Sequence, residues 1–313
     1  MPTNISIGYD PAPVGKYPIS KILTDSDLDG VISGAILKTV YPEAQILQGE
    51  ATGMEQGIYT SLVDKDTVIA DLKYIDGCGL YFDHHESNKP DSENFPGRWM
   101  NLNSAAEVCY QYYRECFDLT KFAPYIDDIG KFDMALFSLD EFLNPNMILK
   151  LGQVIDRNDF AFNIALIEEI VNGSVESAFN LPSVAGKIDN FFAQRELIFK
   201  HISENSYIKD SFAFVDVSGY SGTEKISGPL LTSQFPDVDG VVAFKKRGKE
   251  ANSVKVRFYG NSFNPNRRDI DFLSIAKELS KRAGGHRGAC GFLLDESQTK
   301  DQVIADFLKI VNK

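Results

Sequence analysis

The chain has 313 residues, 43% of them hydrophobic, and a formal net charge of −12 at pH 7. This composition is ordinary for a globular protein, and its apolar runs are shorter than the ~20 residues of a membrane-spanning helix. Residues 1–209 carry 16 Lys and Arg against 31 Asp and Glu, a net charge of −15, whereas residues 210–313 carry 16 against 13, a net charge of +3. An acidic first part is typical of a metal-binding domain counted without its cations, and it disfavours binding to long duplex DNA. A short phosphorylated substrate fits this distribution of charge better.

The N-terminus and the cysteines bear on the cellular compartment. The first 18 residues lack the positively charged start and the apolar stretch of a secretory signal peptide. The four cysteines contain no Cys-x-x-Cys pair, which argues against a structural zinc site and a disulfide framework: Cys78, Cys109, Cys116 and Cys290. We therefore expect a cytoplasmic protein with no membrane partner.

Residues 20–85 alternate short apolar runs with helical patterns. Predicted strands and a predicted helix alternate along this segment, with strands at 21–24, 45–47, 67–70 and 80–82 and the helix at 31–40. This alternation predicts an α/β fold whose N-terminal sheet is mainly parallel and is covered by helices on both faces. Ser104 and Glu107 form a capping-box pattern that opens a further helix, and Cys109 and Cys116 are expected on its buried face.

The second half of the chain changes character near residue 210. Residues 145–205 are mostly helical, with amphipathic stretches at 161–171 and 188–202. Strands and helices are then predicted at 212–215, 240–244, 254–258, 272–282 and 302–311. We predict an N-terminal α/β domain, a helical linker and a smaller C-terminal α/β domain, with the boundaries 1–183, 184–209 and 210–313.

Three carboxylates at alternate positions follow the first predicted strand: Asp25, Asp27 and Asp29, with Gly30 next. Isolated charges of this kind are too costly to bury in a core, and a bound cation would relieve their repulsion. A calcium EF-hand loop would need a glutamate at its twelfth position, where this sequence has Ile36. A solvated acidic turn remains as the alternative.

Two further predicted strands end in polar residues. Asp71 follows one of them, and Asp83, His84 and His85 follow the other. Asp71 alone would more often be a helix cap or a loop residue, but two adjacent histidines after an aspartate are unusual in a chain with four. The carboxyl ends of strands form the ligand crevice in open α/β sheets. Mixed carboxylate and imidazole ligands without thiolates suit Mn²⁺ or a similar ion.

A glycine-rich segment near the C-terminus contains Gly284, Gly285, His286 and Arg287. Glycines allow the backbone to turn its N–H groups toward an anion, and the two basic side chains add donors. By itself this pattern is equally consistent with an ordinary glycine-rich turn.

Together these segments resemble the DHH phosphoesterase superfamily with a C-terminal DHHA1 domain, and in particular its nanoRNase-like, manganese-dependent members. Asp27-Leu28-Asp29-Gly30 is similar to the first motif of the family, Asp71 to the second and Asp83-His84-His85 to the third. Gly284-Gly285-His286 followed by Gly291-Phe292 is similar to the DHHA1 signature.

The sequence departs from the family pattern at two places. Asp25 aligns with a position where many members have a metal-binding histidine, which leaves the metal preference open. The fourth motif is a ligand aspartate, for which Asp133 is preferred because Phe132 precedes it, and Asp128 is the second choice. A tryptophan that usually follows this aspartate is missing.

The resemblance implies two divalent cations, most simply Mn²⁺, with Mg²⁺ or Co²⁺ as alternatives. Asp71 would bridge ions ~3.5–4 Å apart. The remaining ligands would divide between them, with Asp25 and Asp27 on one ion and Asp29, His84 and Asp133 on the other.

The same resemblance assigns roles to the residues around the ions. His85 would contact the substrate phosphate, and Asp83 would orient an imidazole. Gly284, Gly285, His286 and Arg287 would bind the other phosphates of the substrate or its 3′ end.

The function expected from the resemblance is a two-metal phosphodiesterase that hydrolyses short oligonucleotides or dinucleotides by attack of a metal-bound hydroxide on phosphorus. The alternatives are an inorganic pyrophosphatase or exopolyphosphatase, and a non-catalytic nucleotide-binding protein. A processive single-strand exonuclease is disfavoured by the acidic charge, and a homodimer is left open.

Overall fold

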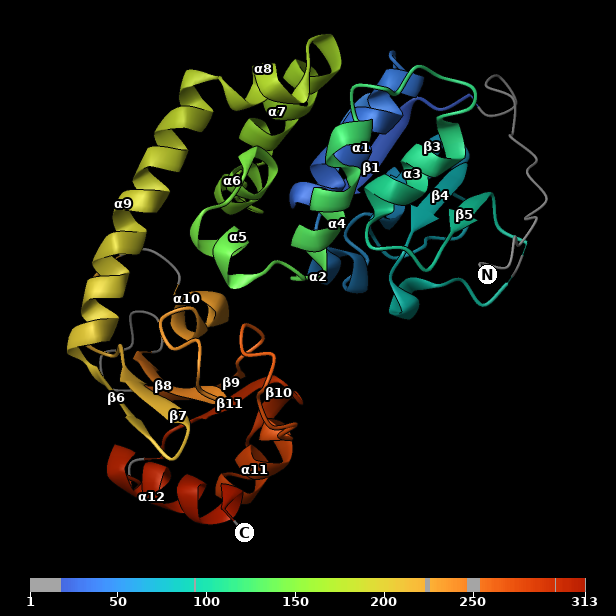
Figure 1. Cartoon of the computed structure of the whole chain (residues 1–313). Helices are drawn as coiled ribbons and strands as arrows, with labels where there is room; N and C mark the ends of the chain where they lie inside the picture. Colours follow the sequence, from blue (N-terminus) through green and yellow to red (C-terminus); the bar gives the residue numbers. More distant parts are fainter. Residues whose placement is uncertain (1–17, 93, 223–225, 247–253, 296, 313) are drawn as a thin grey trace, which may run out of the picture. The chain divides into compact units, whose positions relative to one another are not determined.

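A computed structural model describes residues 18–92, 94–222, 226–246, 254–295 and 297–312 (Figure 1). The chain divides into two compact units. The first runs through Phe137 and resumes over Asn144–Ile188, and the second comprises Ser138–Leu143 and the chain from Asp189 onward. Among the described helices, none combines the length and apolar character needed to cross a membrane. The signal-peptide prediction concerns residues that lie almost entirely outside these ranges.

The first unit contains a five-stranded sheet in the order β2-β1-β3-β4-β5, with every neighbouring pair parallel. Its strands are β1 (Lys21–Asp25), β2 (Gln45–Gly49), β3 (Thr67–Ala70), β4 (Leu80–Asp83) and β5 (Gly97–Trp99). The predicted α/β class and parallel sheet are confirmed. The three-residue edge strand β5 was not predicted, because it is too short to show an apolar period.

Opposite faces of this sheet pack against different elements. Phe82 contacts the rings of Tyr112 and Tyr113 from α3 (Ala105–Tyr113), and α1 (Leu28–Val40) packs against α3 on that face. Residues on the other face form a cluster with α2 (Ala51–Glu55) and the segment after β3: Leu23, Ile69, Tyr81, Met54, Leu72 and Cys78. Burial on both faces explains the continuous apolar runs of these strands.

Short helices complete the first unit. They are η1 (Thr60–Leu62), η2 (Glu86–Asn88), η3 (Ala123–Tyr125), α4 (Ile126–Asp133), α6 (Met147–Val154), α7 (Phe160–Asn172) and α8 (Val175–Phe179). Helix α9 (Pro182–Glu204) begins in the first unit and continues into the second. The mostly helical character predicted for residues 145–205 agrees with this arrangement.

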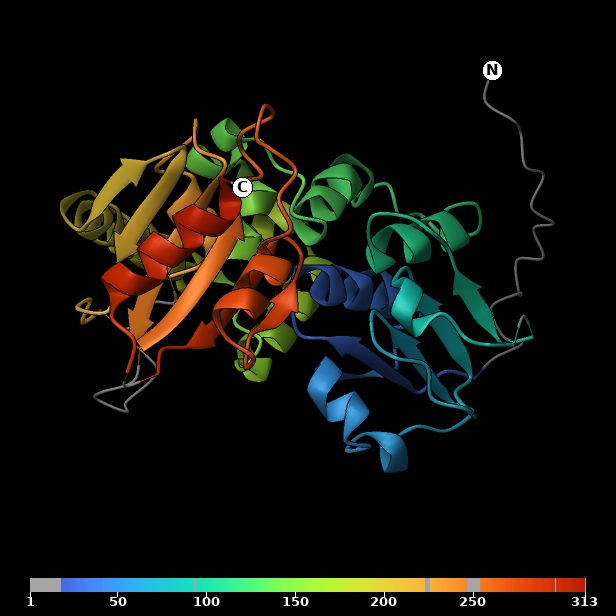
Figure 2. The same ribbon diagram turned by 90° about the horizontal axis from the view of Figure 1, so that it is seen from below.

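The second unit contains a six-stranded mixed sheet in the order β10-β11-β9-β8-β7-β6. Its elements are α5 (Leu139–Leu143), β6 (Ser206–Lys209), β7 (Phe212–Asp216), α10 (Gly228–Thr232), β8 (Gly240–Lys246), β9 (Val254–Gly260), α11 (Phe272–Leu279), β10 (Gly284–His286), β11 (Ala289–Leu293) and α12 (Lys300–Val311). Helices α11 and α12 pack on one face (Figure 2), where Phe307 contacts the rings of Phe212, Phe214 and Phe258.

Two local expectations were wrong. Cys116 lies beyond the end of α3 and is exposed, because its N–H turns to the carbonyl of Tyr113 and the helix stops; only Cys109 joins the core. The helix expected at 272–282 ends at Leu279, since Ser280 has extended backbone angles. In the capping box, Ser104 accepts from the N–H of Glu107 as predicted, but the Glu107 carboxylate accepts from Asn103.

Candidate metal centre

The parallel register brings three predicted aspartates to one edge of the first sheet. Thr24 pairs with Ala70, and Ala70 pairs with Phe82, in adjacent strands. The residues that follow them are Asp25, Asp71 and Asp83. Because the strands are parallel, their carboxyl ends coincide, and the three side chains leave the sheet side by side.

The predicted ligands form three overlapping groups, in each of which the candidate ligand atoms lie within 4.8 Å of one another. One group is Asp25, Asp27 and Asp71; the second is Asp29, His84 and Asp133; the third joins Asp71 with Asp83, His84 and His85. Asp71 thus belongs to the first and the third group, and His84 belongs to the second and the third.

Asp71 has an unusual backbone. Its φ of 59° lies in the left-handed region, which costs a non-glycine residue roughly 1–3 kcal/mol. Its N–H donates to the carbonyl of Phe82 at 3.0 Å, so the pairing with β4 holds this conformation. The carboxylate is buried, and its Oδ2 has no hydrogen-bond partner.

The start of α1 places Asp25 and Asp27. Asp27 is the N-cap, and its Oδ1 accepts from the N–H of Gly30 at 3.1 Å. Asp25 accepts from the N–H of Ser26 at 2.6 Å. A Cβ at position 30 would lie 2.0 Å from the carbonyl oxygen of Asp25, so only glycine lets the helix begin this close to the strand end.

Asp29 links α1 to α3. Its two oxygens accept from the N–H groups of Ala105 at 2.6 Å and Ala106 at 2.7 Å, in the first turn of α3. An anion is favoured there by the helix dipole. Burial nevertheless raises the pKa of Asp29 well above its usual value, and the nearby charges of Asp133 and Asp27 add to this effect.

The ring of His84 is arranged as a metal ligand. Its Nδ1 lies 3.2 Å from the carbonyl of Leu102, which assigns the proton to that nitrogen. Its Nε2 makes no hydrogen bond and faces Asp133 at 3.3 Å, Asp29 at 3.7 Å and Asp71 at 3.9 Å. Burial and the neighbouring His85 lower the pKa of His84, so the Nε2 lone pair is available to a cation.

Asp83 is fully buried and saturated with hydrogen bonds. Its Oδ1 accepts from the N–H groups of His84 and His85 and pairs with Nδ1 of His85 at 2.9 Å. Its Oδ2 accepts from Tyr81 and Asn88, each at 2.8 Å. Burial opposes the charge of Asp83, but these hydrogen bonds outweigh it and keep its pKa below the usual value. The hydrogen bond that His85 donates to Asp83 raises the pKa of His85 to about 9.

The structure distinguishes between the two candidates for the fourth-motif aspartate. Asp133 is the last residue of α4 and lies beside His84, within the cluster. Asp128 lies in the first turn of the same helix and accepts instead from Asn146 at 2.8 Å. The structure therefore brings Asp133, and not Asp128, together with the other predicted ligands.

The cluster is chemically suited to divalent cations. Burial, then the charge of Asp27, raises the pKa values of Asp25 and Asp133 to about 6, and burial raises that of Asp71 well above its usual value. Oxygen and imidazole donors without thiolates match Mg²⁺- and Mn²⁺-type ions. The unpartnered Asp71 Oδ2 and His84 Nε2 are further atoms that a cation would satisfy.

Sequence reasoning missed Arg157, Tyr81 and Asn88. The guanidinium of Arg157 pairs with Asp27 and lies 3.5 Å from Asp25. Arg157 is 130 residues from Asp27, and no local pattern signals that proximity. Tyr81 was assigned to a strand, and its hydroxyl could have been suspected because it lies two positions before Asp83 on the same face.

The predicted substrate-binding residues lie in the second unit. Gly284, Gly285 and His286 form β10, an exposed edge strand rather than a simple turn. Gly285 has φ 129°, and a Cβ there would meet the carbonyl oxygen of Ala289 at 2.6 Å. Arg287 follows, and its guanidinium pairs with Asp269 at 2.8 Å.

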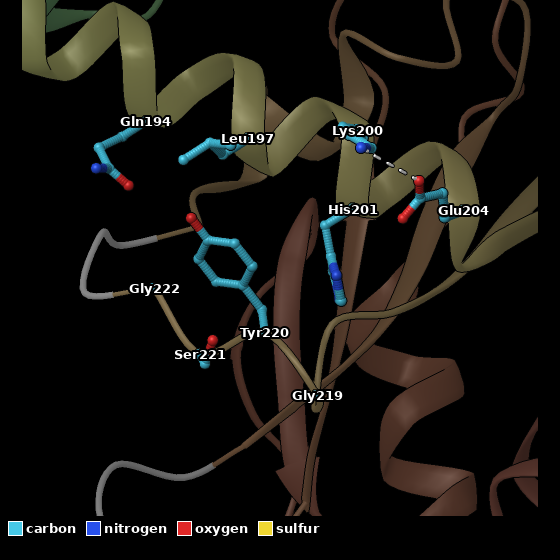
Figure 3. A pocket seen from close by; sticks show the side chains of 9 residues that line it. All are labelled: Gln194, Leu197, Lys200, His201, Glu204, Gly219, Tyr220, Ser221 and Gly222. Atoms are coloured by element: carbon cyan, nitrogen blue, oxygen red, sulfur yellow. Dashed lines mark ion pairs between the residues drawn. The ribbon is translucent and has the colours of Figure 1, made fainter.

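Cavities were found in both units. One of about 200 Å³ in the first unit is lined by the cluster residues Asp27, Asp29 and Asp133 together with Arg157. Another, of about 330 Å³, lies in the second unit between α9 and the segment after β7 (Figure 3). Of its lining residues, His201 and Glu204 are potential metal ligands, so it lacks the donor set of the first unit.

No family model and no curated protein sequence matches the chain. Solved structures do. The pGpG-specific phosphodiesterase PggH from Vibrio cholerae is 18% identical, with a TM-score of 0.80 over 93% of this chain and 99% of that one. The DHH domain of a protein assigned to a family of ribosomal proteins is 16% identical, with a TM-score of 0.59 over 96% and 88%. Exonuclease RecJ bound to manganese is 13% identical, with a TM-score of 0.55 over 97% and 93%.

At these identities the likeness establishes the fold. It extends over both units, since more than nine-tenths of this chain is covered in each comparison. The chain therefore has the fold of the DHH phosphoesterases, the superfamily that its motifs resemble.

Proposed function

We propose that the chain is a divalent-metal-dependent phosphodiesterase that hydrolyses short oligonucleotides or dinucleotides. The observation that carries this proposal is the convergence of two candidate cation sites on Asp71, at the carboxyl edge of a parallel sheet. The fold shared with a pGpG-specific phosphodiesterase and a manganese-bound exonuclease supports it.

Six residues would hold the cations. Asp71 is proposed to bridge two ions. Asp25 and Asp27, which form one group with Asp71, would complete the ligands of one ion. Asp29, His84 and Asp133 form a separate group, in which His84 Nε2 lies 3.9 Å from Asp71 Oδ1, and they would complete the ligands of the other. We propose Mn²⁺, with Mg²⁺ or Co²⁺ as alternatives. When bound, such a pair lowers the pKa of water toward ~7 and neutralises charge on the phosphate.

His85 is proposed to bind the reacting phosphate. Its Nδ1 is held by Asp83, and its side chain is 43% exposed, which leaves Nε2 free to meet a ligand. With a pKa raised to about 9 by that hydrogen bond, the ring carries a proton at neutral pH and donates from Nε2 to a phosphate oxygen. Asp83 acts through His85 and is a positioning residue.

The residues of β10 and Arg287 are proposed to bind the rest of the substrate. They are exposed, and a Cβ at Gly284 would meet no atom within 4 Å, so a ligand can approach the backbone there. The net charge of +3 over residues 210–313 favours an anionic ligand.

Hydrolysis of a dinucleotide and of tripolyphosphate, each with Mn²⁺ and with a chelator, tests the proposal. We expect Mn²⁺-dependent cleavage of the dinucleotide in preference to tripolyphosphate. The reverse preference would make the chain a polyphosphatase, and dinucleotide binding without any turnover would make it a binding protein. Either result contradicts the proposal.

A further inference from the structure

Arg157 lies in the short segment between α6 and α7, and its side chain is directed at the cluster. One guanidinium nitrogen bonds Oδ2 of Asp27, and the other lies 3.5 Å from Oδ2 of Asp25. The side chain is still 55% exposed, so it combines contact with the cluster and access to solvent.

A buried polar network fixes the backbone from which this side chain extends. Ser26 donates from Oγ to the carbonyl of Arg157 at 2.9 Å. The Nδ2 of Asn163 donates both to the carbonyl of Ser26 and to that of Asp156, each at 3.0 Å. Asn163 is fully buried. The segment is therefore anchored to Ser26, which lies between Asp25 and Asp27, and this fixes the backbone position from which the guanidinium extends.

The carboxylates that Arg157 pairs with are those proposed to hold one of the cations. A guanidinium and a divalent ion carry charge of the same sign, so binding of the ion weakens the attraction that holds Arg157 on Asp25 and Asp27. The planar fork of donors then becomes available, and it matches the geometry of phosphate oxygens. Arg157 also lines the cavity of about 200 Å³ together with Asp27, Asp29 and Asp133, three of the proposed ligands.

We infer that Arg157 is a substrate-binding catalytic residue that exchanges partners. It neutralises Asp25 and Asp27 when the cations are absent, and it binds the non-bridging oxygens of the substrate phosphate when they are present. This inference rests on the proposed function and extends it, because it names a protein cation that contacts the reacting phosphate alongside His85.

The test compares Arg157→Met, Arg157→Lys and wild type in two measurements, Mn²⁺ affinity by calorimetry and the kinetics of dinucleotide hydrolysis. Loss of a hydrogen bond to a charged group predicts that kcat/KM of Arg157→Met falls about 10- to 100-fold. Its Mn²⁺ affinity is expected to stay equal or increase, because the guanidinium no longer competes for the aspartates. Arg157→Lys is expected to fall in between, since an ammonium keeps the charge but not the fork.

Arg114→Met is the matched control. Arg114 follows α3, is exposed, and pairs with its neighbour Glu115 at 3.4 Å, so its loss removes one positive charge elsewhere on the first unit. Wild-type kinetics are expected. Circular dichroism and the Tm establish that each variant is folded. If Arg157→Met does not fold, Arg157→Lys takes its place in the comparison with wild type.

Three results would overturn the inference. They are unchanged kcat/KM in a folded Arg157→Met, a loss of activity that only follows a matching loss of Mn²⁺ affinity, and a loss of activity that Arg114→Met reproduces. If wild type itself hydrolyses no dinucleotide, the proposed function fails, and binding of inorganic phosphate to the Mn²⁺-loaded protein decides on Arg157 alone. About 10-fold weaker phosphate binding by Arg157→Met supports the inference, and equal affinity rejects it.

Discussion

Asp71 combines two demands in a single residue. Its carboxylate belongs to two groups of candidate metal ligands, and its backbone is held at positive φ by pairing with Phe82. Aspartate and asparagine tolerate this conformation better than most residues, because their short polar side chains bond locally. A substitution at this position therefore changes charge and backbone strain separately, depending on the residue chosen.

Asp71→Asn removes the charge while keeping the shape and the tolerance of positive φ. We expect Mn²⁺-dependent hydrolysis to fall by more than about 100-fold, beyond the usual effect of losing a residue that only supports a ligand. The metal-free protein should melt at a higher temperature, by roughly 2–4 °C for each kcal/mol of repulsion relieved. A hydrolysis assay with Mn²⁺ measures the first effect, and calorimetry of the chelator-treated protein measures the second. Wild-type activity in the variant would remove Asp71 from the metal centre.

The sequence predicts that Asp71 lies in the site, but it does not predict this for Arg157. Asp71 ends an apolar strand, and a parallel sheet places strand ends together, so its location follows from local pattern and topology. Arg157 reaches the same place because Asn163 anchors its segment against Ser26. Asn163 and Ser26 lie 137 positions apart, and their contact leaves no periodic signal in either segment.

At the scale of elements, the start of α1 is the most constrained junction of the first unit. Asp25, Asp27 and Asp29 depend on a helix that begins within five residues of the strand, and Gly30 permits that approach. The sequence predicted this strand and helix, yet placed the helix start three residues late. Capping by Asp27 explains the difference, since it extends the helix backward into the motif.

Gly30→Ala should disturb this junction, and Gly34→Ala offers a control in the same helix. A Cβ at position 30 would overlap backbone atoms of Asp25, whereas at position 34 the nearest atom is the end of the Ile167 side chain at 3.0 Å. We expect Gly30→Ala to lower the free energy of unfolding by more than about 2 kcal/mol and to weaken Mn²⁺ binding. Gly34→Ala should lie within about 1 kcal/mol of wild type, because higher helix propensity offsets mild crowding. Equal stabilities in urea titrations would disprove the strict requirement at position 30.

Short elements limited the prediction of the fold. The strands β5 and β10 have three residues each, and β10 reads GGH, which carries no apolar alternation. Cys116 was expected in the core from its spacing to Cys109, but the helix ends before reaching it. The strands β7 and β8 were located correctly because their buried stretches, residues 212–215 and 240–244, are unbroken apolar runs.

At the scale of the whole molecule, two carboxyls of the metal cluster and one carboxyl of the second unit have pKa values shifted in opposite directions. In the first, burial and mutual repulsion raise the pKa values of Asp25 and Asp133 from 3.8 to about 6. In the second, burial also acts on Asp239, but hydrogen bonds from Arg268 and Ser211 outweigh it and lower its pKa. Asp25 and Asp133 should therefore change the stability of the first unit in acid with a sign opposite to that of Asp239 in the second.

In metal-free protein, the raised pKa values of Asp25 and Asp133 mean that these carboxyls stabilise the first unit below about pH 4. This contribution is lost as the pH rises to about 6. The lowered pKa of Asp239 means that this carboxylate stabilises the second unit above about pH 4, and that its contribution is lost as the pH falls. Fluorescence of Trp99, the single tryptophan, reports unfolding of the first unit, and hydrogen exchange of β7 and β8 reports the second. Parallel responses of both probes would contradict this assignment. Asp239→Asn should weaken the response of the second unit, with the exposed Asp237→Asn as control.

The pairing of Thr24, Ala70 and Phe82 places each aspartate one residue beyond the last rung that the three strands share. Inserting or deleting a single residue in β1, β3 or β4 would shift that carboxylate by about 3.3 Å and turn it to the opposite face of the sheet. The lengths of the three strands are therefore tied together by the site. Variation in length has to be accommodated in the connections at the far edge of the sheet.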